Sequence, residues 1–223
     1  LNLNQQESDE LDKEIKSLKD SGFDITLQLL DHHITGKVSA AKYDWYFLDD
    51  KRCATKIVFD YLLKEFKAPL NDYKEWVDTV NAVDIWLENE KENFEFGKVL
   101  MSMVTKAREI NSILFNSLDR DFKFYLLKNS IGFLSLENAP IVLDNSVHSL
   151  KKEFLKDGFD DTLDNLSASY LVKSLDKIKD DLTVYYNGQK GLMTYCLGAI
   201  SIPANSFLIA NSDYDFFIDI SRK

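Results

Sequence analysis

The chain has 223 residues, of which 45% are hydrophobic and 29% are charged, and its formal net charge is −10. This length and hydrophobic content suffice for one large folded domain or two small ones. The acidic excess is spread along the chain and leaves no basic stripe, which argues against binding to duplex DNA. A small anionic ligand could bind only where local cations or metal ions offset the acidic field.

The first ninety residues read as helices and strands joined by short links. Leu11, Ile15 and Leu18 recur at helical spacing, and Ser21-Gly22 ends this helix. The predicted elements that follow are a buried strand at 23–30, a short aromatic strand at 43–50, a helix capped by Asp49 or Asp50, and a helix opened by Pro69 that runs through 73–90. Alternation of this kind is typical of an α/β domain with a parallel sheet.

The remainder of the chain divides into a helical part and a strand-rich part. Residues 92–180 read as helical throughout, interrupted by Pro140 and a few glycines. From about residue 181 the pattern predicts two strands within 182–201 joined by a turn at Asn187-Gly188, a short helix starting at Pro203, and a strand at 214–221. We therefore predict an α/β fold with a parallel-sheet domain, a helical connector and a second, smaller α/β domain.

The two cysteines, Cys53 and Cys196, are far apart, and neither belongs to a Cys-x-x-Cys pair. A structural zinc site or a disulfide scaffold is therefore disfavoured, and a cytoplasmic location is expected. No apolar stretch approaches the ~20 residues that span a membrane, so we expect no membrane partner.

Three polar residues, Asp31, His32 and His33, follow directly after the predicted buried strand. Ligands bind at this edge of the sheet in open α/β folds. Neighbouring residues of an extended chain face opposite ways, so we expect the two histidines to have different roles. One can ligate a metal ion while the other reaches a substrate oxygen, and Asp31 can orient a ring by accepting its free N–H. The alternative interpretation is that the triplet consists of ordinary polar loop residues.

The surroundings of the triplet resemble the DHH phosphoesterase family. About twenty residues after Asp31-His32-His33, a helix starts at Cys53-Ala54-Thr55, and the segment "TVNAVDIW" then supplies Asp84. This order of motifs covers about residues 1–100. The segment "IPANSFLIANSDYDFFIDISRK" resembles the opening of the DHH-associated domain, which closes over the active site in that family.

The resemblance implies a role for each matching residue. His32 and Asp84 would be ligands of one manganese ion, and His33 would contact the scissile phosphate. Asp31 would not bind the ion itself but would hold a neighbouring ligand in position through a hydrogen bond. Independently of the resemblance, Thr55 lies at a predicted helix N-terminus, where backbone N–H groups could point toward a phosphate. Two hard divalent ions suit phosphate oxygens and neutralise the charge that develops during hydrolysis, with Mg²⁺ as the alternative to Mn²⁺.

The implied function is that of a manganese-dependent phosphoesterase acting on small nucleotides or short single-stranded oligonucleotides through a two-metal site. Inorganic pyrophosphatase activity ranks below this within the enzyme class. The alternative from another class is a non-catalytic nucleotide-binding or regulatory module that keeps the DHH fold. A homodimer is left open, and the sequence does not determine the substrate.

The sequence departs from the family at both ends. The family's first motif, an Asp-x-Asp, and the aspartate that bridges the ions have no match, and a glycine-rich segment ending in histidine would lie beyond Lys223. We therefore expect the central part of a longer protein, with a DHH-type catalytic domain at 1–135 that lacks its N-terminal part, a helical connector at 136–180, and an incomplete associated domain at 181–223. We expect the isolated chain to bind manganese weakly and to be close to inactive.

Other chemistry-bearing residues favour structural interpretations. His148 lies in a predicted helix without an acidic or cysteine partner at ligand spacing. The pair Asp160-Asp161 is interpreted as solvated or helix-capping. The three tryptophans, Trp45, Trp76 and Trp86, could either stack on nucleobases or pack in the core, and we favour core packing for all three.

Overall fold

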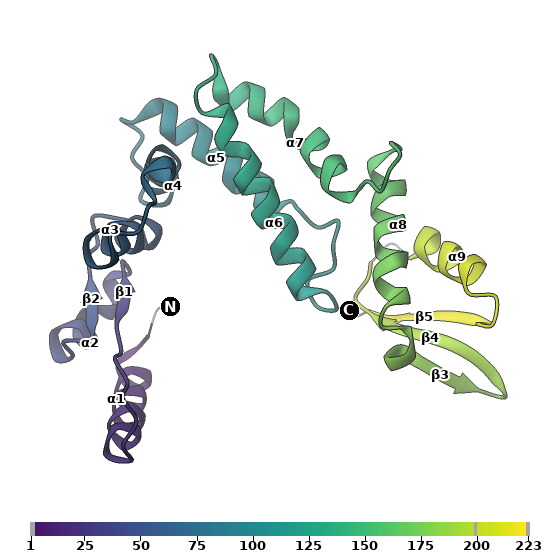
Figure 1. Ribbon diagram of the computed structural model, residues 1–223, viewed down its shortest axis with the longest axis horizontal. Coiled ribbons are helices and arrows are strands. Elements are labelled where there is room, and N and C mark those ends of the chain that lie inside the picture. Colours follow the sequence, from purple (N-terminus) through teal and green to yellow (C-terminus); the bar gives the residue numbers. More distant parts are fainter. Residues whose placement is uncertain (1–2, 199, 222–223) are drawn as a thin grey trace. The chain divides into compact units, whose positions relative to one another are not determined.

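The computed structural model describes residues 3–198 and 200–221 as a mostly helical α/β structure (Figure 1). The chain divides into two compact units, Leu1–Lys98 and Val99–Lys223. The α/β class is thereby confirmed, while the DHH domain, the connector and the associated domain, with boundaries at 135 and 180, stay predictions. No helix within the described residues is both long and apolar enough to cross a membrane.

The first unit begins with α1 (Gln5–Asp20), as its sequence pattern predicts. Asn4 and Glu7 form a capping box, in which each side chain accepts a hydrogen bond from the other residue's backbone N–H. The helix ends where Gly22 takes a left-handed φ of 90°. Asp12 on this helix accepts a hydrogen bond from the Trp45 indole at 3.1 Å, which ties α1 to the segment before the second strand.

The first sheet is smaller than predicted. It consists of β1 (Leu29–Asp31) and β2 (Tyr46–Leu48), which pair in parallel with Asp31 opposite Leu48. The prediction of a strand over 23–30 is wrong for residues 23–28, because a strand needs a hydrogen-bonded partner and β2 offers only three residues. The connection contains a short 3-10 turn, η1 (Ile34–Gly36), and α2 (Lys37–Lys42).

Three further helices follow β2: α3 (Ala54–Phe66), α4 (Lys74–Asp84) and α5 (Lys91–Thr105), with the 3-10 turn η2 (Asn71–Tyr73) before α4. The predicted helix through residue 90 ends early, at Asp84. Trp86 takes a left-handed φ of 62°, and the Leu87 amide donates back to the Ala82 carbonyl at 2.7 Å. This backbone turn closes the helix.

The helical middle of the chain is confirmed in the second unit, and its helices are α6 (Asn116–Ser130), α7 (Ala139–Leu155) and α8 (Leu163–Asp176), with 3-10 turns η3 (Ile131–Phe133) and η4 (Lys179–Leu182). Pro140 is the second residue of α7 instead of breaking a helix, because the first turn of a helix needs no backbone donor at that position. The Phe154 ring lies 5.0 Å from Phe122 and 5.8 Å from Tyr170, so aromatic packing joins the three helices.

The second sheet has the order β3-β4-β5, formed by β3 (Thr183–Tyr186), β4 (Gln189–Tyr195) and β5 (Phe216–Ile220). The predicted hairpin is confirmed, since Asn187 and Gly188 have φ of 49° and 79° between antiparallel β3 and β4. The crossover to parallel β5 runs through α9 (Ser201–Ala210), where Phe207 is fully buried.

Candidate functional site

A buried carboxylate organises the end of β1. Asp31 is 1% exposed, and its Oδ1 accepts hydrogen bonds from the backbone amides of His32 at 2.8 Å and His33 at 3.2 Å. The same oxygen lies 2.7 Å from Nδ1 of His33, and Oδ2 accepts a hydrogen bond from the Tyr46 hydroxyl. An ionised carboxylate only accepts hydrogen bonds, so His33 carries a proton on Nδ1, which orients its ring.

The hydrogen bonds around Asp31 keep it ionised despite its burial. Burial raises the pKa of Asp31, but the Tyr46 hydroxyl, the His33 ring and the two amides outweigh this effect and hold the pKa below its usual value of 3.8. Burial, reinforced by the hydrogen bond to Asp31 and by the negative charge of that residue, raises the pKa of Tyr46 to about 12. At neutral pH the tyrosine is therefore a donor and the aspartate an acceptor.

Glycine is required beside this pair. A Cβ on Gly36 would lie 2.8 Å from Cζ of Tyr46, closer still to its hydroxyl oxygen, and 3.2 Å from Oδ2 of Asp31. The backbone of η1 thus approaches the tyrosine–aspartate hydrogen bond more closely than any side chain permits. The role of Tyr46 depends on the register of β2 against β1, which no local sequence pattern reveals.

The structure brings His32 and Asp84 together from separate elements. Nε2 of His32 lies 3.6 Å from Oδ2 of Asp84, the last residue of α4. Two ligands of one ion, each about 2.1 Å from it, lie within roughly 4.2 Å of each other, so the spacing of 3.6 Å fits a shared ion. The described residues contain no group of three or more His, Cys, Asp and Glu side chains that could hold a metal. The pair therefore supplies two ligand positions, and its metal role stays a prediction.

The expectation that His32 and His33 face opposite ways is wrong. Their ring centroids are 4.2 Å apart, with 56° between the ring planes. Strict alternation holds only within a strand, and β1 ends at Asp31, where both histidine amides turn toward the carboxylate. Their ring nitrogens nevertheless have different partners, since His32 approaches Asp84 and His33 binds Asp31.

The start of α3 is fixed against α4 near the same site. Cys53 is the N-cap residue of α3, and its amide donates a hydrogen bond to the Asn81 side chain at 2.8 Å. Asn81 lies on α4, one helical turn before Asp84. Burial raises the pKa of the Cys53 thiol, and the negative charge of Asp84 adds to the increase, which argues against a thiolate nucleophile. Thr55 is exposed in the first turn of α3, where the Lys56 amide already donates a hydrogen bond to Sγ of Cys53.

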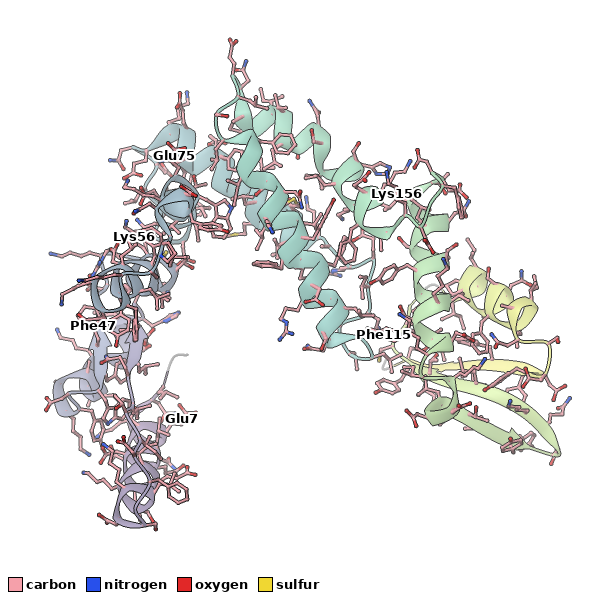
Figure 2. The ribbon with its side chains drawn as sticks, viewed as in Figure 1. Glu7, Phe47, Lys56, Glu75, Phe115 and Lys156 are labelled. Carbon is pink, nitrogen blue, oxygen red and sulfur yellow. The ribbon has the colours of Figure 1, made fainter. Side chains whose placement is uncertain are left out.

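Two basic side chains next to this helix start, Arg52 and Lys56, are already paired with carboxylates. Lys56, labelled in Figure 2, lies 3.3 Å from Asp60 and 3.0 Å from Asp78. Arg52 binds Asp49 at 2.7 Å and also pairs with Asp60. These ion pairs join α3 to α4 and to the end of β2. The charges of Arg52 and Lys56 are therefore largely offset, and bound metal ions or the helix N-terminus would have to contribute to attracting an anion here.

The three tryptophans have different environments. Trp45 is partly buried and stacks with Tyr43, with 5.0 Å between ring centroids. Trp76 is partly buried, and its indole nitrogen has no hydrogen-bond partner. Trp86 is 64% exposed, so the core-packing interpretation is wrong for this residue.

Comparisons with known proteins place the chain beside two longer relatives. It is 41% identical to a 3',5'-cyclic-nucleotide phosphodiesterase of Helicobacter pylori over 228 residues, which cover 100% of this chain and 65% of the relative. It also matches the crystal structure of an uncharacterized protein from Helicobacter pylori G27, with a TM-score of 0.84 and 42% identity over 99% of this chain and 65% of that one. No protein-family model matches the chain. The chain thus spans about 65% of the length of both relatives, and its resemblance to the DHH family stays a prediction.

Proposed function

We propose that the chain is part of a metal-dependent phosphoesterase that hydrolyses phosphate ester bonds of small nucleotides, with 3',5'-cyclic nucleotides as the first candidates. The observation that carries the proposal is the 3.6 Å approach of His32 Nε2 to Asp84 Oδ2, beside a second histidine held by a buried carboxylate. The name of the Helicobacter pylori relative supports the choice of substrate.

The proposal gives each side chain a separate task. His32 and Asp84 would hold one divalent ion, Mn²⁺ by resemblance or Mg²⁺ in its place. Bound ions in such two-metal sites activate water and neutralise charge on the phosphate. The His33 side chain is half-exposed and its Nδ1 binds Asp31, so its Nε2 is the ring nitrogen that would contact a phosphate oxygen.

Asp31 and Thr55 complete the arrangement. Asp31 would act as a positioning residue, because its hydrogen bonds fix the His33 ring and the backbone of both histidines. Thr55 lies at the positive N-terminal end of α3, which would attract phosphate oxygens, and the Lys56 amide would have to exchange its Cys53 Sγ acceptor for a phosphate oxygen. The net charge of −10 favours small nucleotides or short single strands over duplex nucleic acid.

A non-catalytic nucleotide-binding or regulatory module is the second candidate. The observation in its favour is that the described residues offer two ligands at the site and no group of three. Such a module would bind nucleotides with little or no hydrolysis, since two-metal chemistry needs both ions about 3.5–4 Å apart.

The test is hydrolysis of 3',5'-cyclic AMP and of a dinucleotide, with Mn²⁺, by the full-length gene product that contains this sequence. The proposal predicts metal-dependent turnover that His32→Ala and Asp84→Ala nearly abolish. Nucleotide binding without turnover would favour the module. Turnover that persists in both variants would show that other residues perform the chemistry.

A further inference from the structure

Trp86 occupies a backbone conformation that favours glycine. It lies two residues beyond Asp84 and has a φ of 62°. The Leu87 amide donates to the Ala82 carbonyl across this residue, the hydrogen-bonding pattern that closes helices around a left-handed glycine. A bulky side chain is strained there, and strained residues cluster at sites of ligand binding and catalysis. The ring therefore calls for an explanation other than helix termination.

The Trp86 ring is exposed but held in place. Its Nε1 donates a hydrogen bond to the Glu88 carboxylate at 2.6 Å. The Phe94 ring, which is buried, meets the indole almost at a right angle, with 5.1 Å between the centroids. These two contacts orient the indole, while 64% of the residue stays accessible to solvent. A fixed, exposed aromatic ring is what a nucleobase needs for stacking.

We propose that Trp86 stacks on the base of the nucleotide whose phosphate lies at His32 and Asp84. This inference rests on the proposed function and adds a binding residue to the same site. Two peptide units separate the Cα atoms of Asp84 and Trp86 by at most about 7.6 Å. The ribose of a nucleotide separates its phosphate from its base over a comparable span.

Stacking on Trp86 also predicts the specificity of the site. Every base has an aromatic face, so stacking distinguishes nucleotides from sugar phosphates without selecting one base. Stacking of a base on the indole involves no ionic group, so it does not require the side chains of Arg52 and Lys56, which are paired with carboxylates. Of the three tryptophans, Trp86 alone is exposed, which leaves Trp45 and Trp76 as internal references.

Binding by the 223-residue chain tests this directly, with Mn²⁺ present and calorimetry as the measurement. The ligands are 3',5'-cyclic AMP and its base-free counterpart, ribose 3,5-cyclic phosphate. The variants are Trp86→Gly, which suits the backbone but removes the ring, and Trp86→Tyr, which keeps an aromatic face. A thermal unfolding midpoint for Trp86→Gly no lower than that of the wild type shows that any loss of binding is not a loss of fold.

We expect the wild type to bind cyclic AMP more tightly than the base-free ligand. Trp86→Gly should weaken binding of cyclic AMP roughly tenfold or more and leave binding of the base-free ligand unchanged, so this variant should no longer prefer cyclic AMP. Trp86→Tyr should retain most of the preference for cyclic AMP. Equal affinity of the wild type for both ligands, undetectable binding of cyclic AMP, or full affinity in Trp86→Gly would overturn the inference. Failure of the proposed function is a separate result, because it appears as absent hydrolysis by the full-length protein.

Discussion

Two regions of the molecule place a histidine among carboxylates, and they differ in how those groups are held. At the end of β1, Asp31 is buried and fixes His33 through a 2.7 Å contact. In the second unit, His148 lines an open hollow of about 570 Å³, together with Lys152 and three aspartates, Asp160, Asp161 and Asp164.

Two of the three carboxylates of the second hollow, those of Asp160 and Asp161, already have partners at the surface. Asp160 has a side chain that is 72% exposed and pairs with Lys152 at 2.7 Å. Asp161 accepts hydrogen bonds from the Asn165 side chain and the Thr162 amide next to the start of α8. Neither aspartate orients the His148 ring through a hydrogen bond or ion pair that the described residues show. A large hollow with the right residue types is therefore less informative than a small, buried and fully hydrogen-bonded carboxylate.

The largest expected effect separates the two regions by activity. His32→Ala or Asp84→Ala in the full-length protein should lower Mn²⁺-dependent hydrolysis of cyclic AMP by more than roughly 100-fold, because each removes a metal ligand. His148→Ala is the matched control and should leave the rate unchanged. Equal losses from all three variants would remove the distinction between the regions.

Asp31→Asn should have the next largest effect. The amide keeps the shape of the side chain but presents an N–H₂ group to partners that are themselves donors. We expect turnover to fall about 10–100-fold and the free energy of unfolding to fall by about 1.5–3 kcal/mol. Kinetics and urea denaturation measure the two losses, and an unchanged rate would show that the orientation of His33 does not matter.

Gly36→Ala should destabilise the first unit through a steric clash. The added Cβ would overlap the Tyr46 hydroxyl, so we expect a loss of about 1–3 kcal/mol in the free energy of unfolding. Gly132→Ala is the matched control, since a Cβ there has no atom within 4 Å. In the double variant with Tyr46→Phe, the clash should be partly relieved, and a double-mutant cycle measures this coupling. Strict additivity would contradict the close approach.

Tyr46→Phe should have a smaller effect that depends on pH. The hydroxyl helps to hold the pKa of Asp31 below 3.8, so ionised Asp31 contributes stability above that value, and the contribution is lost as pH falls through the lower, folded-state pKa. The variant should lose about 1 kcal/mol of unfolding free energy at neutral pH. The difference from the wild type should shrink below about pH 4. Denaturation across this range checks the sign, and a difference that grows in acid would contradict it.

The smallest effect is expected in the second hollow. Asp160→Asn removes a largely exposed ion pair with Lys152, so the free energy of unfolding should stay nearly unchanged, with no change in hydrolysis. A marked loss of activity would assign this hollow a function that its contacts do not indicate.

Local sequence signals predicted most of the helices and the C-terminal hairpin. The Asn187-Gly188 turn and the helical middle depend on backbone preferences of nearby residues, which a sequence shows directly. The resemblance to a known family also predicted that His32 and Asp84 act on the same ion, and the structure places them 3.6 Å apart. That they bind a metal there stays a prediction.

The missed features depend on partners far away in the sequence. The prediction of a strand over residues 23–28 is wrong because no described strand pairs with those residues. A hydrophobic pattern does not show whether a pairing partner exists. The approach of Tyr46 and Gly36 to Asp31 follows from the parallel register of β1 and β2. Trp86 was assigned to the core by residue type alone, whereas the end of α4 exposes it.

The most direct test of the account is a titration of the 223-residue chain with Mn²⁺, followed by calorimetry in the wild type and in three variants: His32→Ala, Asp84→Asn and the double variant. If both residues hold one ion, each single variant should weaken Mn²⁺ binding about tenfold or more. The loss of Mn²⁺ affinity in the double variant should be much smaller than the product of the two single losses, because either substitution alone already disrupts the shared site. His148→Ala should bind as the wild type does. Wild-type affinity in either single variant, or independent losses that multiply in the double variant, would contradict a shared metal site at His32 and Asp84.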